Sequence, residues 1–449
     1  MLDGPHVAPA PLRVALLGLG TVGREVARGL LTCGSRLEQA ANGREVRLVA
    51  VADREPARFE GLDLRDVERV DDGARLIGRP EIDVVVELIG GVETAGRLVA
   101  AALEAGHAVV TANKALLARH GADLERLARA HGTALRFEAA VGGAIPVLAP
   151  LAGDLAANRI DAVRGILNGS TNYVLTSMTE DGAAYEDVVA QAKTLGFLEA
   201  DPRVDLEGRD AADKLAVLIR LAFGVWPDVT AIRRAPPALD GRAKGRAQGR
   251  AKDHAKGDGP PGVTGVTAAL IEAARRENLV IKLVAYAARG DDGRIAAWVL
   301  PVAVPAHDPL ARTDGPENRI EIVGEPVGRV AFVGQGAGGA PTSSAVLGDL
   351  LAIARGEGST WAGLPQAPTL APDRLVDGMD APRRWLMCDQ TGGGGDKGGN
   401  ADNGGGADNG GNADTGGGAI TDRATIDELR ARLGAARPGA VLFPVLEGS

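Results

Sequence analysis

The chain has 449 residues, of which 45% are hydrophobic and 3% aromatic, and its formal net charge is -9. This acidic balance gives no support to a nucleic-acid or membrane partner. The sequence contains no run of about 18 apolar residues, which a membrane-spanning helix would need. Two cysteines imply no disulfide framework, and the first residues lack a signal-peptide pattern, so we expect a cytoplasmic protein.

The first third of the chain alternates short apolar runs with helical patterns. Strands are predicted at residues 13–17, 46–52, 83–89 and 108–111, and helices at 21–31, 95–105 and 116–130. Continuous Val, Leu and Ile runs indicate strands that are covered on both faces, as in a parallel sheet. Residues 11–150 are therefore predicted to form a Rossmann-type, doubly wound parallel sheet of the α/β class.

From about residue 150 the pattern changes. Helices are predicted at 186–195, 211–223 and 268–276, and strands at 281–287, 296–304 and 329–332. This mixture is typical of an α+β domain, which we place at residues 151–340. A last helix at 344–356 is expected to pack back on the first domain.

Two segments of biased composition interrupt this order. Residues 236–260 hold a basic repeat between prolines, which is better explained as a solvated insertion than as a nucleic-acid site. Residues 391–419 repeat Ala-Asp-Asn-Gly-Gly but lack the apolar residues that a calcium-binding β-roll needs. Both segments are expected to be disordered, which leaves residues 380–449 as a short, degenerate C-terminal segment of strand, helix (425–433) and strand.

A glycine-rich turn follows the first predicted strand. Gly18, Gly20 and Gly23 form a Gly-x-Gly-x-x-Gly pattern, which permits a tight turn and brings the backbone close to a pyrophosphate at a helix N-terminus. Asp53 ends the next strand, and its carboxylate could accept from a ribose hydroxyl and favour NAD. Arg54 could instead hold the 2′-phosphate of NADP. The sequence leaves the choice between NAD and NADP open.

Charged residues form a second candidate site. Lys114 follows a predicted strand and so lies at the carboxyl edge of the sheet, where such folds bind ligands. Asp210 and Lys214 are four residues apart and share one face of a helix. A solvated ion pair would be the ordinary explanation, but the helix continues with an apolar run, and Glu199 and Asp205 add carboxylates just before it. A lysine held beside a carboxylate can orient a carbonyl and give it a proton.

These segments together resemble the homoserine dehydrogenase family. The most specific part is the Glu-x-Asp-Pro…Asp…Gly-x-Asp…Lys pattern from Glu199 to Lys214, and the resemblance covers about residues 11–232 and 262–356. It implies NAD(P)H-dependent reduction of L-aspartate 4-semialdehyde to L-homoserine, in threonine, methionine and isoleucine biosynthesis. It also implies a homodimer.

The resemblance assigns a role to each candidate residue. Lys214 would donate the proton to the developing alkoxide, Lys114 would reach the nicotinamide and the carbonyl, and Asp210 would support the substrate or Lys214. Glu199 and Asp205 would bind the substrate. Cofactor contacts would come from Gly18, Gly20, Thr21, Val22, Gly23, Asp53, Arg54, Lys114 and Gly336. Main-chain oxygens of Glu138, Val141, Gly143 and Ile145 would hold a monovalent cation such as sodium.

The C-terminal segment departs from the family, many of whose members carry an amino-acid-binding regulatory domain. One strand, one helix and one strand are too few for such a domain, so we expect threonine feedback to be weak or absent.

Two alternative functions stay open. Another amino-acid dehydrogenase of this architecture, such as one for aspartate, would have no reason to keep Glu199, Asp210 and Lys214 together. A cofactor-binding sensor without activity would be expected to have lost a lysine.

Overall fold

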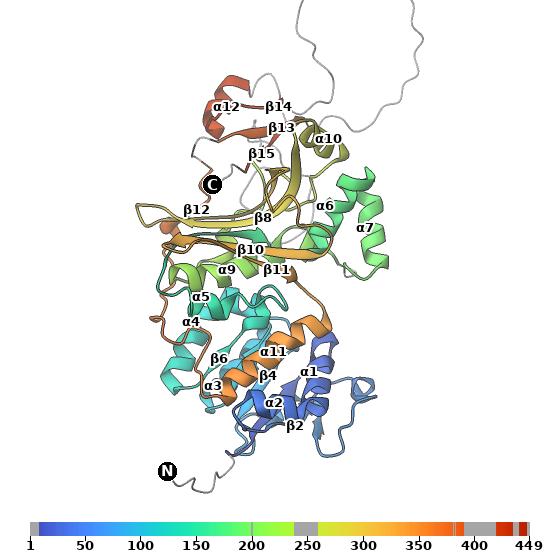
Figure 1. Ribbon diagram of the computed structural model, residues 1–449, viewed down its shortest axis with the longest axis vertical. Coiled ribbons are helices and arrows are strands. Elements are labelled where there is room, and N and C mark those ends of the chain that lie inside the picture. Colours follow the sequence, from blue (N-terminus) through green and yellow to red (C-terminus); the bar gives the residue numbers. More distant parts are fainter. Residues whose placement is uncertain are drawn as a thin grey trace, which may run out of the picture.

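The computed structural model describes residues 9–198, 201–237, 259–379, 381, 383–389, 419–433 and 440–446. Three sheets follow one another along the long axis of the molecule, with the N-terminal sheet at the bottom of Figure 1 and the C-terminal sheet at the top. The predicted fold class, a Rossmann-type parallel sheet followed by an α+β part, is confirmed.

Six parallel strands form the first sheet, in the order β3-β2-β1-β4-β5-β6. The strands are β1 (Leu12–Leu17), β2 (Val46–Ala52), β3 (Glu68–Val70), β4 (Val84–Glu87), β5 (Ala108–Thr111) and β6 (Leu135–Arg136). The helices are α1 (Thr21–Thr32), α2 (Gly34–Ala40), α3 (Glu93–Glu104), α4 (Lys114–His131) and α11 (Gly339–Ala354). Successive residues of β1 point to opposite faces, where α1, α2 and α11 cover one side and α3 and α4 the other.

The second sheet has the order β11-β10-β7-β8-β9-β12, in which only β12 runs parallel to its neighbour. Its strands are β7 (Arg159–Ile166), β8 (Leu279–Arg289), β9 (Ile295–Pro305), β10 (Glu317–Glu325), β11 (Gly328–Gln335) and β12 (Leu375–Val376). The helices of this part are α5 (Leu148–Ala152), α6 (Gly169–Asp181), α7 (Tyr185–Thr194), α8 (Arg203–Leu206), α9 (Arg209–Phe223) and α10 (Ala268–Arg276). Helices α6, α9 and α10 pack on one face of the sheet.

Five strands of the first two sheets were not predicted from the sequence: β3, β6, β7, β10 and β12. Strands β3, β6 and β12 have only two or three residues each. In β7 and β10 charged side chains interrupt the apolar pattern, and they are buried only because the strands pair: Arg164 donates to Glu321 across the sheet at 2.8 Å. The residues near each charge in the sequence do not reveal that an opposite charge on another strand will neutralise it.

Local capping places the helices that carry the predicted site. The Asn113 side chain accepts from the N–H of Leu116 and starts α4, and the Asn168 side chain accepts from Thr171 and starts α6. Helix α9 begins after Gly208, whose φ of 72° suits glycine. These caps put Lys114 in the first turn of α4 and Asp210 in the first turn of α9.

The C-terminal residues form a small third sheet, with the order β14-β13-β15 and with α12 packed beside it. Its elements are β13 (Trp385–Asp389), β14 (Ala419–Ile420), α12 (Ile426–Leu433) and β15 (Ala440–Pro444). Trp385 and Leu442 pack on Trp298 and Leu300 of β9, so this sheet covers part of the second sheet. Ala419 was predicted to lie in the linker, and this was wrong because Ala419 belongs to β14, which pairs with β13.

Both segments that were expected to be disordered lie mainly outside the described residues, at 238–258 and 391–418. The ends of the basic insertion are described, and Gly259 donates to the carbonyl of Pro236 at 2.9 Å. The two described ends of the insertion therefore lie next to each other.

Candidate active site

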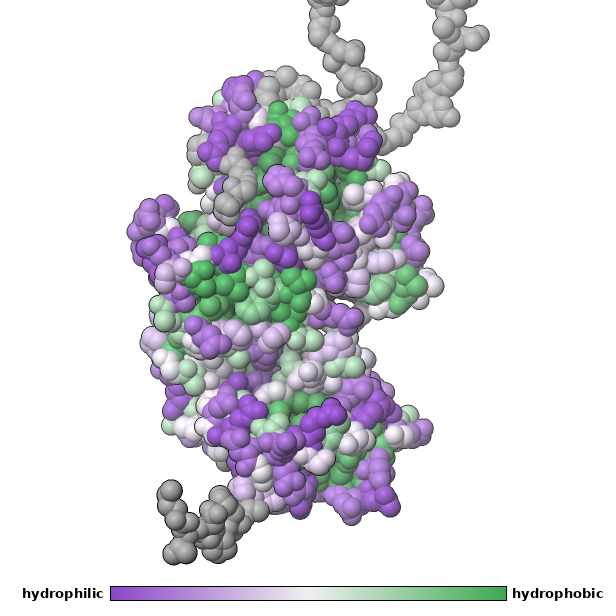
Figure 2. Space-filling view, in the orientation of Figure 1, coloured by the Kyte–Doolittle hydropathy of each residue, from purple (hydrophilic) through white to green (hydrophobic). Residues whose placement is uncertain are grey.

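A cavity of about 690 Å³ lies between the first and second parts of the chain. The space-filling view shows its setting as an indentation on the right, below α7 (Figure 2). Nine of the predicted site residues line it: Gly20, Thr21, Val22, Lys114, Gly143, Asp205, Asp210, Lys214 and Gly336. Residues that are far apart in the sequence thus meet in one cavity.

The charged centre of this cavity is Asp210. Its carboxylate lies 2.8 Å from Nζ of Lys214 and 3.2 Å from Nζ of Lys114, so it holds both lysines. Lys214 also donates to the carbonyl of Leu167 at 2.7 Å. The Asn168 side chain donates to Asp210 at 2.8 Å and to Asp205 at 2.7 Å, which fixes the two carboxylates beside each other.

The lysines differ in exposure. The side chain of Lys214 is 8% exposed and that of Lys114 is 38% exposed. Lys214 is held by an anion and a carbonyl and is almost buried, whereas Lys114 is more exposed, and both line the cavity. Two ammonium groups of this kind can polarise a carbonyl oxygen from two directions and supply it with a proton.

Burial and charge set the pKa values in this centre. Burial alone would raise the pKa of Asp210, but the charges of Lys214 and Lys114 outweigh it and hold that pKa well below the usual value. The charge of Asp210 raises the pKa of Lys114. Burial and the neighbouring charge of Asp210 raise the pKa of Asp205, and burial raises the pKa of Asp213 although Arg119 opposes it. Asp210 is therefore the permanent anion of the site.

The glycine-rich turn forms the other end of the cavity. A Cβ on Gly23 would lie 1.9 Å from the carbonyl oxygen of Gly18, and a Cβ on Gly18 would lie 2.7 Å from that of Leu88. Gly18 and Gly23 therefore allow close packing and do not line the cavity. Gly20 faces open space, with its nearest neighbour at 3.9 Å, as a residue beside a pyrophosphate should.

The Asp53 side chain points into the glycine-rich turn and does not line the cavity. Its carboxylate accepts from the N–H of Leu19 at 2.7 Å and of Glu55 at 2.9 Å, and its side chain is only 6% exposed. Arg54 is exposed and does not line the cavity. Arg58, which the sequence analysis did not consider, lies 3.4 Å from Asp53 and beside Gly20.

Glu87 lies at the carboxyl end of β4 and lines the cavity, and it was not predicted from the sequence. Its buried carboxylate accepts from Thr111 at 2.6 Å and from the N–H groups of Ile89 and Gly90 at 2.9 and 3.0 Å. The available signal was its position at the same edge of the parallel sheet as Lys114.

The predicted cation segment lies in the link between the two parts. The Glu138 side chain accepts from the N–H groups of Val147, Leu148 and Ala149 at 2.7, 2.8 and 2.7 Å, so it is not free to bind an ion. The prediction concerns the main-chain oxygens of Glu138, Val141, Gly143 and Ile145, and it stays a prediction. Among the described residues, no group of three His, Cys, Asp or Glu could hold a metal ion.

Glu199, in the loop before α9, lies outside the described residues. Asp201 is exposed and paired with Arg203 at 2.5 Å, away from the cavity. Within the described ranges, no helix is long and apolar enough to cross a membrane.

Comparison with known proteins gives consistent matches. Residues 146–351 match a family model described as homoserine dehydrogenase, and residues 18–138 match its NAD-binding domain. The homoserine dehydrogenase of Corynebacterium glutamicum is 42% identical over 368 residues, which are 79% of this chain and 76% of that protein. That of Mycobacterium tuberculosis is 39% identical over 370 residues, or 80% of this chain and 77% of its own.

Solved structures agree in fold. A homoserine dehydrogenase from Thiobacillus denitrificans superposes with a TM-score of 0.72 at 34% identity, covering 86% of this chain and 85% of that chain. One from S. aureus has a TM-score of 0.70 at 26% identity and covers 98% of this chain and 100% of its own.

Proposed function

This chain belongs to the homoserine dehydrogenase family, and we propose that it reduces L-aspartate 4-semialdehyde to L-homoserine with a reduced nicotinamide cofactor. The observation that carries the proposal is the meeting of Lys114, Asp210 and Lys214 in one cavity that also contains the glycine-rich turn. A charged centre at one end and a phosphate-binding turn at the other suit a small polar substrate and a dinucleotide.

Each residue of the centre has a chemical task. The bound cofactor supplies the hydride. Lys214, held by Asp210 and by the carbonyl of Leu167, gives a proton to the substrate oxygen as negative charge develops on it. Lys114 stabilises the same oxygen from the wall of the cavity. Asp205, with Glu199, provides the negative charge that an α-ammonium group requires.

We further propose that NADPH is the preferred cofactor. The Asp53 carboxylate accepts from two backbone N–H groups of the turn, is only 6% exposed and does not line the cavity, so it is poorly placed for a ribose hydroxyl. Arg54 is exposed, and Arg58 lies beside the turn, where it also pairs with Glu55 at 2.9 Å. Both add positive charge there, and guanidinium groups bind phosphate well.

Three further expectations stay proposals. Sodium would be held by main-chain oxygens of residues 138–145, and raised thermal stability in sodium chloride over tetramethylammonium chloride would test this. A homodimer fits β11, an edge strand that exposes Val333, and light scattering would measure its mass. A cytoplasmic location fits the two free cysteines.

The decisive experiment follows the absorbance of NADPH and of NADH with L-aspartate 4-semialdehyde, for the wild type and for Lys214→Ala. We expect fast oxidation that the variant loses while it still binds cofactor. No turnover by a folded protein that binds cofactor would contradict the proposal, and turnover of a different amino acid would identify another dehydrogenase.

A further inference from the structure

Helices α4 and α9 lie side by side and are joined by ion pairs at three levels. Because α4 belongs to the first part of the chain and α9 to the second, these pairs connect the cofactor side of the cavity to the substrate side. We call them the α4–α9 ladder. Its rungs are Lys114–Asp210 at 3.2 Å, Arg119–Asp213 at 3.2 Å and Glu125–Arg220 at 2.7 Å.

The charges of the ladder specify one register. Residue numbers increase in the same direction along both helices from rung to rung. Helix α4 presents two cations and then the anion Glu125, and α9 presents two anions and then the cation Arg220. A slip by one rung would place Glu125 against Asp213, and two carboxylates facing each other in a buried interface repel. Sliding is also opposed by Gly121, where a Cβ would lie only 2.4 Å from the ring of Trp226.

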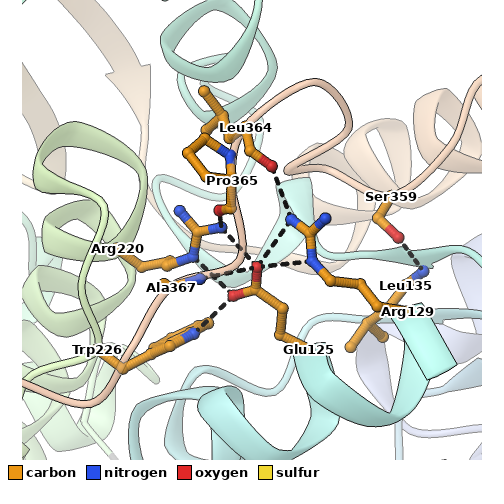
Figure 3. A network of polar contacts seen from close by, with 9 residues as sticks. All are labelled: Glu125, Arg129, Leu135, Arg220, Trp226, Ser359, Leu364, Pro365 and Ala367. Atoms are coloured by element: carbon orange, nitrogen blue, oxygen red, sulfur yellow. Dashed lines mark hydrogen bonds and ion pairs between the residues drawn. The ribbon is translucent and has the colours of Figure 1, made fainter.

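The third rung is fully buried, since the side chains of Glu125 and Arg220 are both 0% exposed. Arg220 donates to both carboxylate oxygens of Glu125, each at 2.7 Å, and Trp226 donates at 2.9 Å (Figure 3). Arg129, one turn further along α4, also donates to the Glu125 carboxylate at 2.9 Å. Burial would raise the pKa of Glu125, but the bonds from Arg220 and Trp226 keep it below its usual value.

The same rung fixes a third segment of the chain. Arg220 donates to the carbonyl of Pro365 at 3.0 Å and Arg129 to that of Leu364 at 2.8 Å, as Figure 3 shows. This segment leads from α11 to β12, so it crosses the two helices at the end remote from the cavity. The far ends of α4 and α9 are thereby held at a fixed separation.

A buried ion pair adds little net stability compared with apolar residues of the same size, but it can impose a unique arrangement. We propose that Glu125 and Arg220 are positioning residues, which set the register of α4 on α9 and so keep Lys114 and Lys214 on their shared partner Asp210. The proposal rests on the proposed function, because that function needs the two lysines at one substrate oxygen. Neither positioning residue lines the cavity.

Glu125→Gln tests the proposal, with Glu321→Gln as the matched control. Glu321 is also 0% exposed and also accepts from two arginines, Arg164 at 2.8 Å and Arg319 at 2.7 Å, but within the second sheet alone. Both variants should lose thermal stability. Only Glu125→Gln should lower kcat, by about tenfold to a hundredfold, because a misplacement near 1 Å can have that effect. Its KM for NADPH should stay within about twofold, since the glycine-rich turn is untouched.

Arg220→Lys covers the case that Glu125→Gln does not fold. It keeps the charge but cannot bind both carboxylate oxygens, so an intermediate fall in kcat is expected. The proposal is overturned if a folded Glu125→Gln or Arg220→Lys keeps the wild-type kcat, or if Glu321→Gln loses as much. The wild type in the same assay separates the two proposals, because an inactive wild type contradicts the proposed function and active variants contradict only the ladder.

Discussion

Replacement of Asp210 by asparagine should affect the site more than any other conservative change in it. The variant keeps the shape of the side chain but removes the charge that faces Nζ of Lys214 at 2.8 Å and of Lys114 at 3.2 Å. Two ammonium groups would then share one cavity without their common anion. The pKa of Lys114, which the charge of Asp210 raises, should fall back toward its ordinary value.

The magnitude follows from the burial of the three groups. At an effective dielectric constant of ~20, each charge pair at about 3 Å attracts by ~5 kcal/mol, most of which offsets desolvation. Breaking a buried pair typically costs about 3–5 kcal/mol, and the exposure of Lys114 favours the lower end. For a domain of this size that is a fall in Tm of roughly 10 °C. Because the proton donor also loses its orientation, kcat should fall by about a hundredfold or more.

Oxidation of NADPH with the semialdehyde measures kcat, and thermal unfolding measures Tm. The matched control is Asp201→Asn, which removes an exposed carboxylate from the loop before α9 and should leave both values unchanged. If Asp210→Asn kept kcat within about threefold of the wild type, Asp210 could not be the residue that holds the two lysines in place.

Arg58→Gln should raise KM for NADPH much more than KM for NADH, and equal changes in the two KM values would contradict the assignment of the 2′-phosphate. Burial and the charge of Asp349 raise the pKa of Glu138, so the folded protein binds a proton more readily than the unfolded chain. As pH falls from 7 toward 5, the free energy of unfolding of the wild type should therefore rise relative to that of Glu138→Gln. A fall in this difference, measured by chemical denaturation, would show the sign to be wrong. Gly143→Ala should lower the free energy of unfolding by about 2 kcal/mol or more, because the φ of Gly143 is 59° and the new Cβ would lie 2.7 Å from the carbonyl carbon of Gly336. An unchanged denaturation midpoint would refute this.

The sequence alone determined the features that depend on residues close together in the chain. The pattern Gly18-x-Gly20-x-x-Gly23 predicts a phosphate-binding turn because tight turns and close helix packing need glycine at those positions. The spacing of Asp210 and Lys214 places them on one helical face. The buried apolar runs of β1, β2, β4 and β5 predict a parallel sheet.

Only the tertiary structure decided which distant residues meet. Nothing in the sequence near Asp53 indicates that Leu19 would bind its carboxylate, and nothing near Lys114 indicates that Asp210 of another helix would be its partner. Charged residues such as Glu125 resemble surface residues until a cation is placed against them. The physical reason is that the cost of burying a charge depends on its partner, and the partner of a long-range pair is chosen by the packing of whole elements and not by neighbouring residues.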